Sequence, residues 1–203
     1  MKKTYSIPFC ADGDPAWEKI PCISIDVCLA EKKSDTKAWG QLCWNPDWIK
    51  VHLFAEEKEI LARYTGECDP VWTDSCLEFF FCPVYEDPNY LNLECNPNGS
   101  MFFGIGVGRY DRIRLVPQQD LRKLLSIKTA RTENGWETFY TIPTALIRRF
   151  FPSYVPESGH MIRANLYKCG DDKTEPEYLM WSPITNGKAD FHQSEFFGDL
   201  TFE

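Results

Sequence analysis

Residues 69–83 read Asp-Pro-Val-Trp-Thr-Asp-Ser-Cys-Leu-Glu-Phe-Phe-Phe-Cys-Pro, and this stretch decides the fold class of the chain. It opens as a turn, because Pro70 disfavours a helical conformation for Asp69. Cys76 to Cys82 form an apolar, aromatic run that is typical of a β-strand buried on both faces. Pro83 ends the run because proline has no N–H to donate to a neighbouring strand. The chain is therefore expected to be built around a central strand at residues 76–82.

Two residues fit this buried strand poorly. Glu78 is a carboxylate inside the apolar run, and Trp72 is a large aromatic side chain in the loop that leads into it. A buried carboxylate is costly unless it is hydrogen-bonded or paired, so Glu78 requires a partner. That partner is either structural, such as a backbone turn or an arginine, or a ligand held in a binding site.

The rest of the chain repeats the pattern of short strands and tight turns. Strand-like segments flank the turn sequences Asn45-Pro46-Asp47, Asn96-Pro97-Asn98-Gly99 and Asn134-Gly135. The one convincing helix pattern runs from Thr144 to Phe151, with a proline on each side. We therefore predict a single domain over residues 1–203. Its fold class is all-β, a β-sandwich of about ten mostly antiparallel strands with one short helix.

Composition excludes several classes of partner. The formal net charge of −8 argues against nucleic acid and against an anionic membrane surface, because both attract clustered lysine and arginine. No run approaches the roughly 20 apolar residues of a membrane span. Lys2 and Lys3 are not followed by the apolar stretch of a signal peptide, so a soluble, cytoplasmic protein is expected.

Metal sites are not predicted from the sequence pattern. The nine cysteines contain no C-x-x-C pair, which argues against zinc, and most lie in apolar, strand-like segments where free thiols act as small hydrophobic groups. Several aspartates lie in loops, where oxygen-rich calcium sites form, but no ordered spacing singles them out: Asp12, Asp14, Asp69, Asp74, Asp171 and Asp172. The metal content stays unassigned, and no cofactor is expected.

Gly104, Gly106 and Gly108 are spaced by two on a strand-like segment, so one face of that segment lacks side chains. Such a face allows close approach of either a ligand or another backbone. It is not a nucleotide-binding glycine motif, because no helix pattern follows at the required spacing.

Several segments together resemble a known family. Val71 to Phe80 and Asn92-Leu93-Glu94-Cys95-Asn96-Pro97-Asn98-Gly99 are similar to carbohydrate-binding modules of family 9. Ala164 to Asp172, Met180 to Ile184 and Asp190 to Gly198 resemble the standalone bacterial members of that family. The resemblance covers nearly the whole chain, and it implies a β-sandwich related to the DOMON group of sugar- and haem-binding domains.

The resemblance implies non-catalytic binding of a mono- or oligosaccharide. The characterised modules clamp a terminal sugar between two tryptophans, and Trp72 and Trp181 match that pair. Glu78 matches the carboxylate that accepts sugar hydroxyls, and Asn96 matches a hydrogen-bonding asparagine on the next strand. Some modules also carry structural calcium.

This sequence departs from the family pattern at two positions. Glu94 and Leu77 fall where the modules carry basic residues, which points to a different sugar or to none. His192 lies eleven residues after Trp181 and is expected to fix a loop or to line the site.

Sugar chemistry supports these assignments independently. The C–H faces of a sugar pack on aromatic planes, while its hydroxyls need a few convergent polar partners. A carboxylate accepts hydroxyl protons in short, charge-assisted bonds. Tryptophans in a sandwich also serve as core residues, so packing is the alternative role of Trp72 and Trp181.

Two other functions stay open. Glu78 with Glu94 or Asp74 could form a glycosidase pair, which needs two carboxylates roughly 5–10 Å apart across a cleft. Alternatively, His192 with Met101 or Met180 could hold haem, as in some members of the wider fold group.

Overall fold

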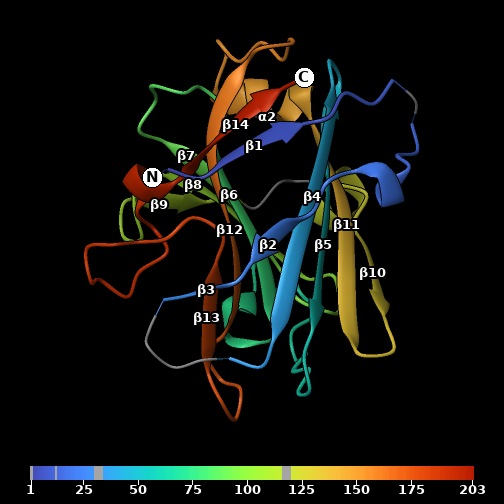
Figure 1. Ribbon diagram of the computed structural model, residues 1–203, viewed down its shortest axis with the longest axis vertical. Helices are drawn as coiled ribbons and strands as arrows, with labels where there is room; N and C mark the ends of the chain where they lie inside the picture. Colours follow the sequence, from blue (N-terminus) through green and yellow to red (C-terminus); the bar gives the residue numbers. More distant parts are fainter. Residues whose placement is uncertain (1, 12, 30–33, 116–119) are drawn as a thin grey trace.

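The computed structural model describes residues 2–11, 13–29, 34–115 and 120–203. Within these ranges the chain forms two β-sheets that stack as a sandwich, with the larger sheet at the left of Figure 1 and the smaller at the right. The larger sheet has nine strands: β1 (Thr4–Ile7), β3 (Val27–Cys28), β6 (Cys76–Cys82), β7 (Tyr90–Cys95), β8 (Met101–Gly106), β9 (Arg112–Arg114), β12 (Met161–Gly170), β13 (Glu177–Met180) and β14 (Gly198–Phe202). The smaller sheet has five: β2 (Ile23–Ile25), β4 (Lys37–Asn45), β5 (Trp48–Glu56), β10 (Lys128–Arg131) and β11 (Gly135–Pro143). The fold class predicted from the sequence is confirmed.

The strand order differs from the chain order. The larger sheet runs β1-β14-β12-β6-β7-β8-β9, with β13 beside β12 and β3 beside β13. The smaller sheet runs β10-β11-β5-β4-β2. Between named strands of the described chain, only β1 and β14 pair in parallel.

The central strand lies where the sequence predicts it. β6 covers Cys76–Cys82, is fully buried along its length and pairs with β12 on one side and β7 on the other. Successive side chains alternate between the faces of the sheet. Leu77, Phe79 and Phe81 therefore share one face, and Glu78 and Phe80 share the other.

Contacts between the sheets identify the inner face. Cys95, which is opposite Leu77, has its Sγ 3.4 Å from Oγ1 of Thr138 on β11 in the smaller sheet. Gly40 of β4 approaches β12 so closely that a Cβ there would lie 2.2 Å from Cδ2 of Leu166. Leu77, Phe79 and Phe81 thus face the core, and Glu78 lies on the outer face of the larger sheet.

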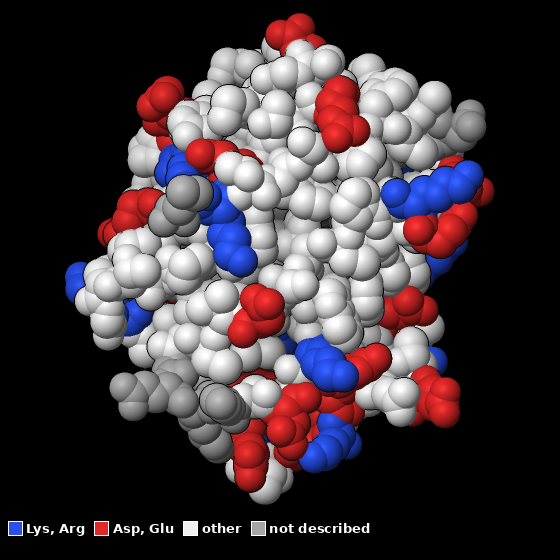
Figure 2. Space-filling model, viewed as in Figure 1, with Lys and Arg blue, Asp and Glu red and all other residues white. Residues whose placement is uncertain are grey.

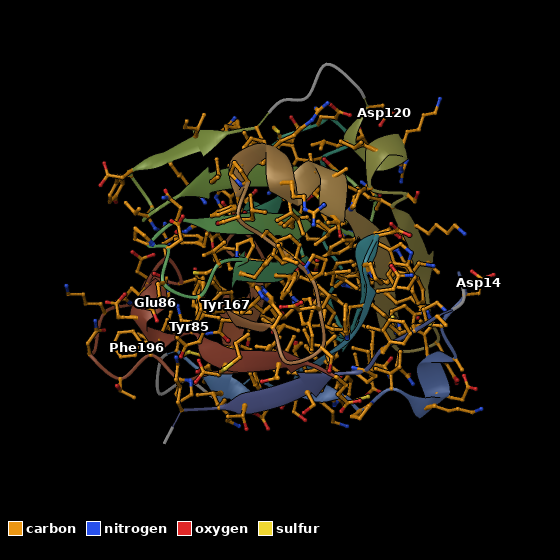
Figure 3. The ribbon with its side chains drawn as sticks, turned by 90° about the horizontal axis from the view of Figure 1, so that it is seen from above. Asp14, Tyr85, Glu86, Asp120, Tyr167 and Phe196 are labelled. Atoms are coloured by element: carbon orange, nitrogen blue, oxygen red, sulfur yellow. The ribbon has the colours of Figure 1, made fainter. Side chains whose placement is uncertain are left out.

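Loops cover this outer face, which explains why β6 is buried on both sides. The Phe191 ring stacks on Tyr167 of β12, with 4.0 Å between centroids and 14° between planes. The Tyr167 hydroxyl donates to the Phe191 carbonyl oxygen at 2.9 Å. Tyr167 lies inside the fold in Figure 3, and Tyr85, Glu86 and Phe196 lie nearer the rim.

Short helices connect the strands. The α-helices are α1 (Leu121–Leu124) and α2 (Thr144–Phe150), and the 3₁₀-helices are η1 (Trp17–Lys19), η2 (Val71–Thr73) and η3 (Ser194–Phe196). The predicted helix at 144–151 corresponds to α2. Asp120 caps α1 by accepting a hydrogen bond from the Lys123 backbone N–H at 3.3 Å. None of the helices in the described residues is long and apolar enough to cross a membrane.

The described residues contain fourteen strands, more than the approximately ten predicted. Short strands account for much of the difference: β3 has two residues and β9 has three. A segment of that length has too few positions to display an alternating pattern. Its strand conformation depends on the neighbour with which it pairs.

Candidate functional site

Two buried carboxylates meet on the outer face of the larger sheet. Glu78 of β6 and Glu94 of β7 are directly opposite each other in the antiparallel register, and each is 2 % exposed. Opposite side chains of this kind have Cβ atoms about 5 Å apart. The register of β6 and β7 therefore places the two carboxylates side by side on neighbouring strands.

The two carboxylates have unequal partners. Glu94 Oε1 accepts from Asn92 Nδ2 at 2.7 Å and lies 3.4 Å from Nη1 of Arg112. Glu78 Oε1 accepts only from the Cys169 thiol, at 2.9 Å, among its described side-chain contacts. Burial raises the pKa of Glu78 well above its ordinary value, and the charge of Glu94 raises it further. Burial also raises the pKa of Glu94, although the Arg112 charge acts in the opposite direction.

His192 joins this group from the loop that covers the sheet. Arg112 Nη1 is 3.1 Å from Nε2 of His192, and the Tyr90 hydroxyl is 2.7 Å from its Nδ1. Arginine can only donate, so Nε2 is the acceptor, and Nδ1–H donates to Tyr90. Burial lowers the pKa of His192 to about 2, with Arg112 and Arg109 adding to the effect, and the imidazole is neutral.

Aromatic side chains border the charged groups. Trp72 of η2 is partly buried and packs edge-on against Phe102 of β8, with 5.4 Å between ring centroids. The guanidinium carbons of Arg112 and Arg114 lie 4.9 and 5.0 Å from the Phe102 centroid. The backbone of Trp72 is also close to the carboxylates, because its carbonyl accepts from the Cys169 thiol at 3.5 Å.

Asn96 serves the fold rather than an open surface. It is fully buried, and its Nδ2 donates to the Tyr64 carbonyl and to Asp74 Oδ2, both at 2.9 Å. Its Oδ1 accepts from the backbone N–H groups of Asn98 and Ser100. All of the amide's main hydrogen-bonding positions are therefore occupied by the protein itself.

Trp181 lies in the core. The residue is 5 % exposed, and its ring packs so closely on Gly198 that a Cβ there would lie 2.5 Å from Cζ3. The Trp181 backbone N–H donates to the carbonyl oxygen of Leu166, within β12. The Trp72 carbonyl oxygen accepts instead from the backbone N–H of Asp171, which follows the end of β12. The structure brings Trp72, Glu78, Glu94 and His192 to the outer face of the larger sheet, and it does not bring Trp181 there as an exposed partner of Trp72.

Sequence reasoning missed Arg112. The signal that could have pointed to Arg112 is the glycine spacing on β8. Gly106 of that strand is opposite both Tyr90 and Arg112 in the sheet. A Cβ on Gly106 would lie 2.2 Å from the Asp111 carbonyl oxygen and 2.4 Å from Cα of Arg112. Of the two alternatives left open by the glycine spacing, close approach of another backbone is the one observed. It places the Arg112 guanidinium over Phe102 and beside Glu94.

Some of the side chains that could hold haem or calcium already have protein partners or face the core. Met101 is opposite Cys95 and faces the core, while the His192 nitrogens are engaged by Tyr90 and Arg112. Asp74 accepts from the backbone N–H groups of Arg63 and Tyr64 and from the Arg63 side chain. Of the other loop aspartates, Asp12 lies outside the described residues.

A separate cleft of about 1350 Å³ lies between the ends of β4, β5 and β13 and the β10–β11 turn. None of the six predicted site residues lines it. Its charged side chains are of both signs, and Figure 2 shows such a mixture at the lower end of the face drawn there. The predicted site residues lie elsewhere, so we place the candidate site at Glu78, Glu94, Arg112, His192 and Trp72.

Comparison with known proteins agrees with this fold. The family model described as "Carbohydrate-binding family 9" matches residues 18–202. The chain belongs to this family. The family assignment inferred from the sequence motifs is therefore confirmed, and non-catalytic carbohydrate binding is the function that the family supports. No protein of curated function matches the chain.

Solved structures of family 9 modules and of a related protein share the fold. A Bacteroides uniformis protein to which carbohydrate binding is attributed is 26 % identical, with 100 % of both chains covered and a TM-score of 0.84. A family 9 module from Caldicellulosiruptor kristjanssonii in complex with cellotriose is 12 % identical, with 99 % of this chain and 94 % of that chain covered and a TM-score of 0.67. The module from the same organism in complex with glucose is also 12 % identical, with 99 % and 96 % covered and a TM-score of 0.68. At 12 % identity, the last two comparisons bear on the fold of this chain and not on its ligand.

Proposed function

We propose that this family 9 protein binds a mono- or oligosaccharide without cleaving it, on the outer face of the larger sheet. The observation that carries the proposal is the pair of buried carboxylates, Glu78 and Glu94, beside the partly exposed Trp72. The glucose and cellotriose bound by the Caldicellulosiruptor modules make neutral sugars the first ligands to test.

The chemistry of the group suits a sugar. The C–H face of a pyranose ring packs on an aromatic plane, and its hydroxyls need several directional partners close together. Trp72 supplies the aromatic surface. Arg112 is a donor for ring or hydroxyl oxygens, and Glu78 and Glu94 are acceptors for hydroxyl protons.

The remaining residues have positioning roles in this proposal. His192 holds Arg112 through Nε2, and Asp190 holds Arg109 through a 3.0 Å ion pair that joins the β8–β9 hairpin to the covering loop. Asn96 fixes the turn after β7. Trp181 supports β14 from within the core.

Titration calorimetry with glucose and cellotriose tests the proposal. Wild-type protein is expected to release or absorb heat on binding, and Trp72→Ala is expected to weaken the affinity at least about tenfold, or about 1.4 kcal/mol. Trp48→Ala is the matched control, because Trp48 is a partly buried tryptophan that lies beside Lys50 on the smaller sheet. Equal affinity in wild type and Trp72→Ala would contradict the proposed platform.

A second measurement separates binding from catalysis. Aryl glycosides are incubated with wild type and with Glu78→Gln, and no turnover is expected in either sample. Turnover that Glu78→Gln abolishes would indicate a glycosidase that uses the paired carboxylates instead.

A further inference from the structure

Two cysteines that are far apart in the chain meet beside Glu78. Cys76 of β6 and Cys169 of β12 are directly opposite each other in the antiparallel register. Glu78 is two residues beyond Cys76, so its side chain lies on the same face of the sheet. The two sulfur atoms and a Glu78 carboxylate oxygen all lie within 4.8 Å of one another.

The surroundings of Glu78 favour a cation. Glu78 is 2 % exposed, and the hydrogen bond that its carboxylate receives comes from the Cys169 thiol, which is a weak donor. Glu94 is directly opposite, and the Arg112 contact is made to Glu94 rather than to Glu78. A buried carboxylate needs a strong hydrogen-bonding partner, a counter-charge or a metal ion.

We propose that Cys76, Cys169 and Glu78 form a zinc-binding site on the outer face of the larger sheet. Two thiolates and one carboxylate are ligands that zinc accepts, and three protein ligands leave a fourth tetrahedral position. The Trp72 carbonyl oxygen lies 3.5 Å from the Cys169 sulfur.

The geometry requires only a small adjustment. Zinc–sulfur bonds of about 2.3 Å in a tetrahedron place the two sulfur atoms about 3.8 Å apart. The ligand atoms already lie within 4.8 Å of one another, so side-chain rotations close the remaining gap. Binding transfers the protons of both thiols, and of Glu78 where it is protonated, to solvent, and no electron is exchanged.

The zinc site does not require a bound sugar, although it shares Glu78 with the proposed sugar site. One carboxylate oxygen of Glu78 faces Cys169 and is available to the metal. The other oxygen is then free to accept a sugar hydroxyl. Zinc would thereby hold Glu78 ionised and fixed in orientation at the floor of the proposed sugar site.

Cobalt(II) is the spectroscopic probe for this site. The full-length protein is reduced, treated with a chelator, dialysed and titrated with cobalt(II) in the absence of sugar. We expect saturation at one equivalent, with thiolate-to-cobalt charge transfer in the near ultraviolet and the visible bands of a tetrahedral ion. Zinc is expected to displace the cobalt and abolish both sets of bands.

Three variants test the ligands. Cys169→Ser, Cys76→Ser and the near-isosteric Glu78→Gln are each expected to weaken metal affinity at least about 100-fold, more than most changes outside the ligand set. Cys82→Ser is the matched control, because Cys82 is buried on the same strand and the same face but opposite Arg163. Circular dichroism verifies the fold of each variant, and Glu78→Gln keeps the test valid if a cysteine variant does not fold.

Three results would overturn the proposal. These are the absence of cobalt bands, an equal loss of affinity in Cys82→Ser and Cys169→Ser, and a mass showing that Cys76 and Cys169 form a disulfide in the purified protein. A protein that binds cobalt but neither glucose nor cellotriose would support the zinc site and contradict the proposed function. Sugar binding without metal binding would do the reverse.

Discussion

Glu78 and Asn96 are both buried polar side chains, but they differ in what the protein offers them. Asn96 has two acceptors for its amide N–H groups and two backbone donors for its oxygen. Glu78 has a thiol. A polar group that the fold already satisfies gains little from a ligand, whereas an under-satisfied one gains a great deal. At the scale of single residues, this difference is why we propose Glu78, and not Asn96, as a ligand-binding residue.

The two predicted tryptophans are expected to respond differently to truncation. Trp181→Ala removes a core side chain packed on Gly198 and should lower the free energy of unfolding by about 3–5 kcal/mol. Trp72→Ala should cost less, because Trp72 is only partly buried. Urea denaturation of both variants measures the difference. An equal loss of stability would mean that Trp72 is as much a core residue as Trp181.

His192 is expected to add an acid-sensitive contribution to stability. The groups that face it are Tyr90, Arg112, Arg109 and the Asp190 carboxylate, which accepts from the His192 backbone N–H. Its pKa falls from 6.5 to about 2 on folding, so between these values the unfolded chain binds a proton that the folded chain does not. Its contribution is therefore complete above pH 6.5 and declines as the pH falls below it.

The comparison that checks this contribution is wild type against His192→Gln, by urea denaturation across the same pH range. Glutamine retains a donor and an acceptor but does not titrate. The stability difference between the two proteins should shrink as the pH falls below 6.5. A difference that does not change with pH would contradict a neutral, buried imidazole.

At the scale of elements, β12 pairs with β6, β13 and β14 in the larger sheet and also carries a lysine of a buried ion network. Lys168 Nζ lies 3.0 Å from Glu57, just after β5, and 2.7 Å from Glu177 of β13. Lys173 lies 2.5 Å from each of the same carboxylates. Trp136 of β11 donates its indole N–H to Glu57 at 2.5 Å, so the network joins strands from both sheets. Burial alone would raise the pKa of Glu177, but the Lys168 charge and the hydrogen bonds from both lysines lower it.

Removing one charge should expose the cost of burying the others. Lys168→Met leaves two buried carboxylates with Lys173 as their remaining cation in the described network and should destabilise the fold by about 3–5 kcal/mol. Lys58→Met breaks the solvent-exposed pair with Asp35 and should leave the denaturation midpoint nearly unchanged. Urea unfolding of both variants provides the measurement. A mild effect of Lys168→Met would mean that the network relaxes around the vacancy.

At the scale of the whole molecule, the sandwich hides most of its thiols. Six of the nine cysteines are buried: Cys43, Cys68, Cys76, Cys82, Cys95 and Cys169. Cys22 is exposed, and Cys10 and Cys28 are intermediate. Burial raises the pKa of Cys43, Cys82 and Cys95 to about 12. The thiolate is the reactive form, so these side chains should be inert while the fold is intact.

Alkylation followed by peptide mass spectrometry tests this protection. In native buffer Cys22 should react first, and the six buried cysteines should react only in denaturant. The rate for the buried set then reports opening of the whole sandwich. Rapid native labelling of Cys95, which lies between the two sheets, would contradict the packing described for the inner face.

The amino-acid pattern alone predicted the all-β fold class, the central strand at Cys76–Cys82, the helix after Pro143 and the family. It did so because alternation, turn residues and motif order are local properties that a linear chain displays. It also singled out Glu78, because one carboxylate in an apolar run is anomalous wherever the strand lies.

Long-range strand pairing set which residues share the outer face with Glu78. The β6–β7 register placed Glu94 opposite it, and the approach of β9 to Gly106 brought Arg112 to Glu94. The β6–β12 register brought together Cys76 and Cys169, a pair that no C-x-x-C spacing predicts. Trp181 and Asn96 entered the interior for the same reason. Pairing between strands that are distant in sequence sets which side chains are buried and which touch. The residues of one strand do not indicate which strand will pair with it, or in which register.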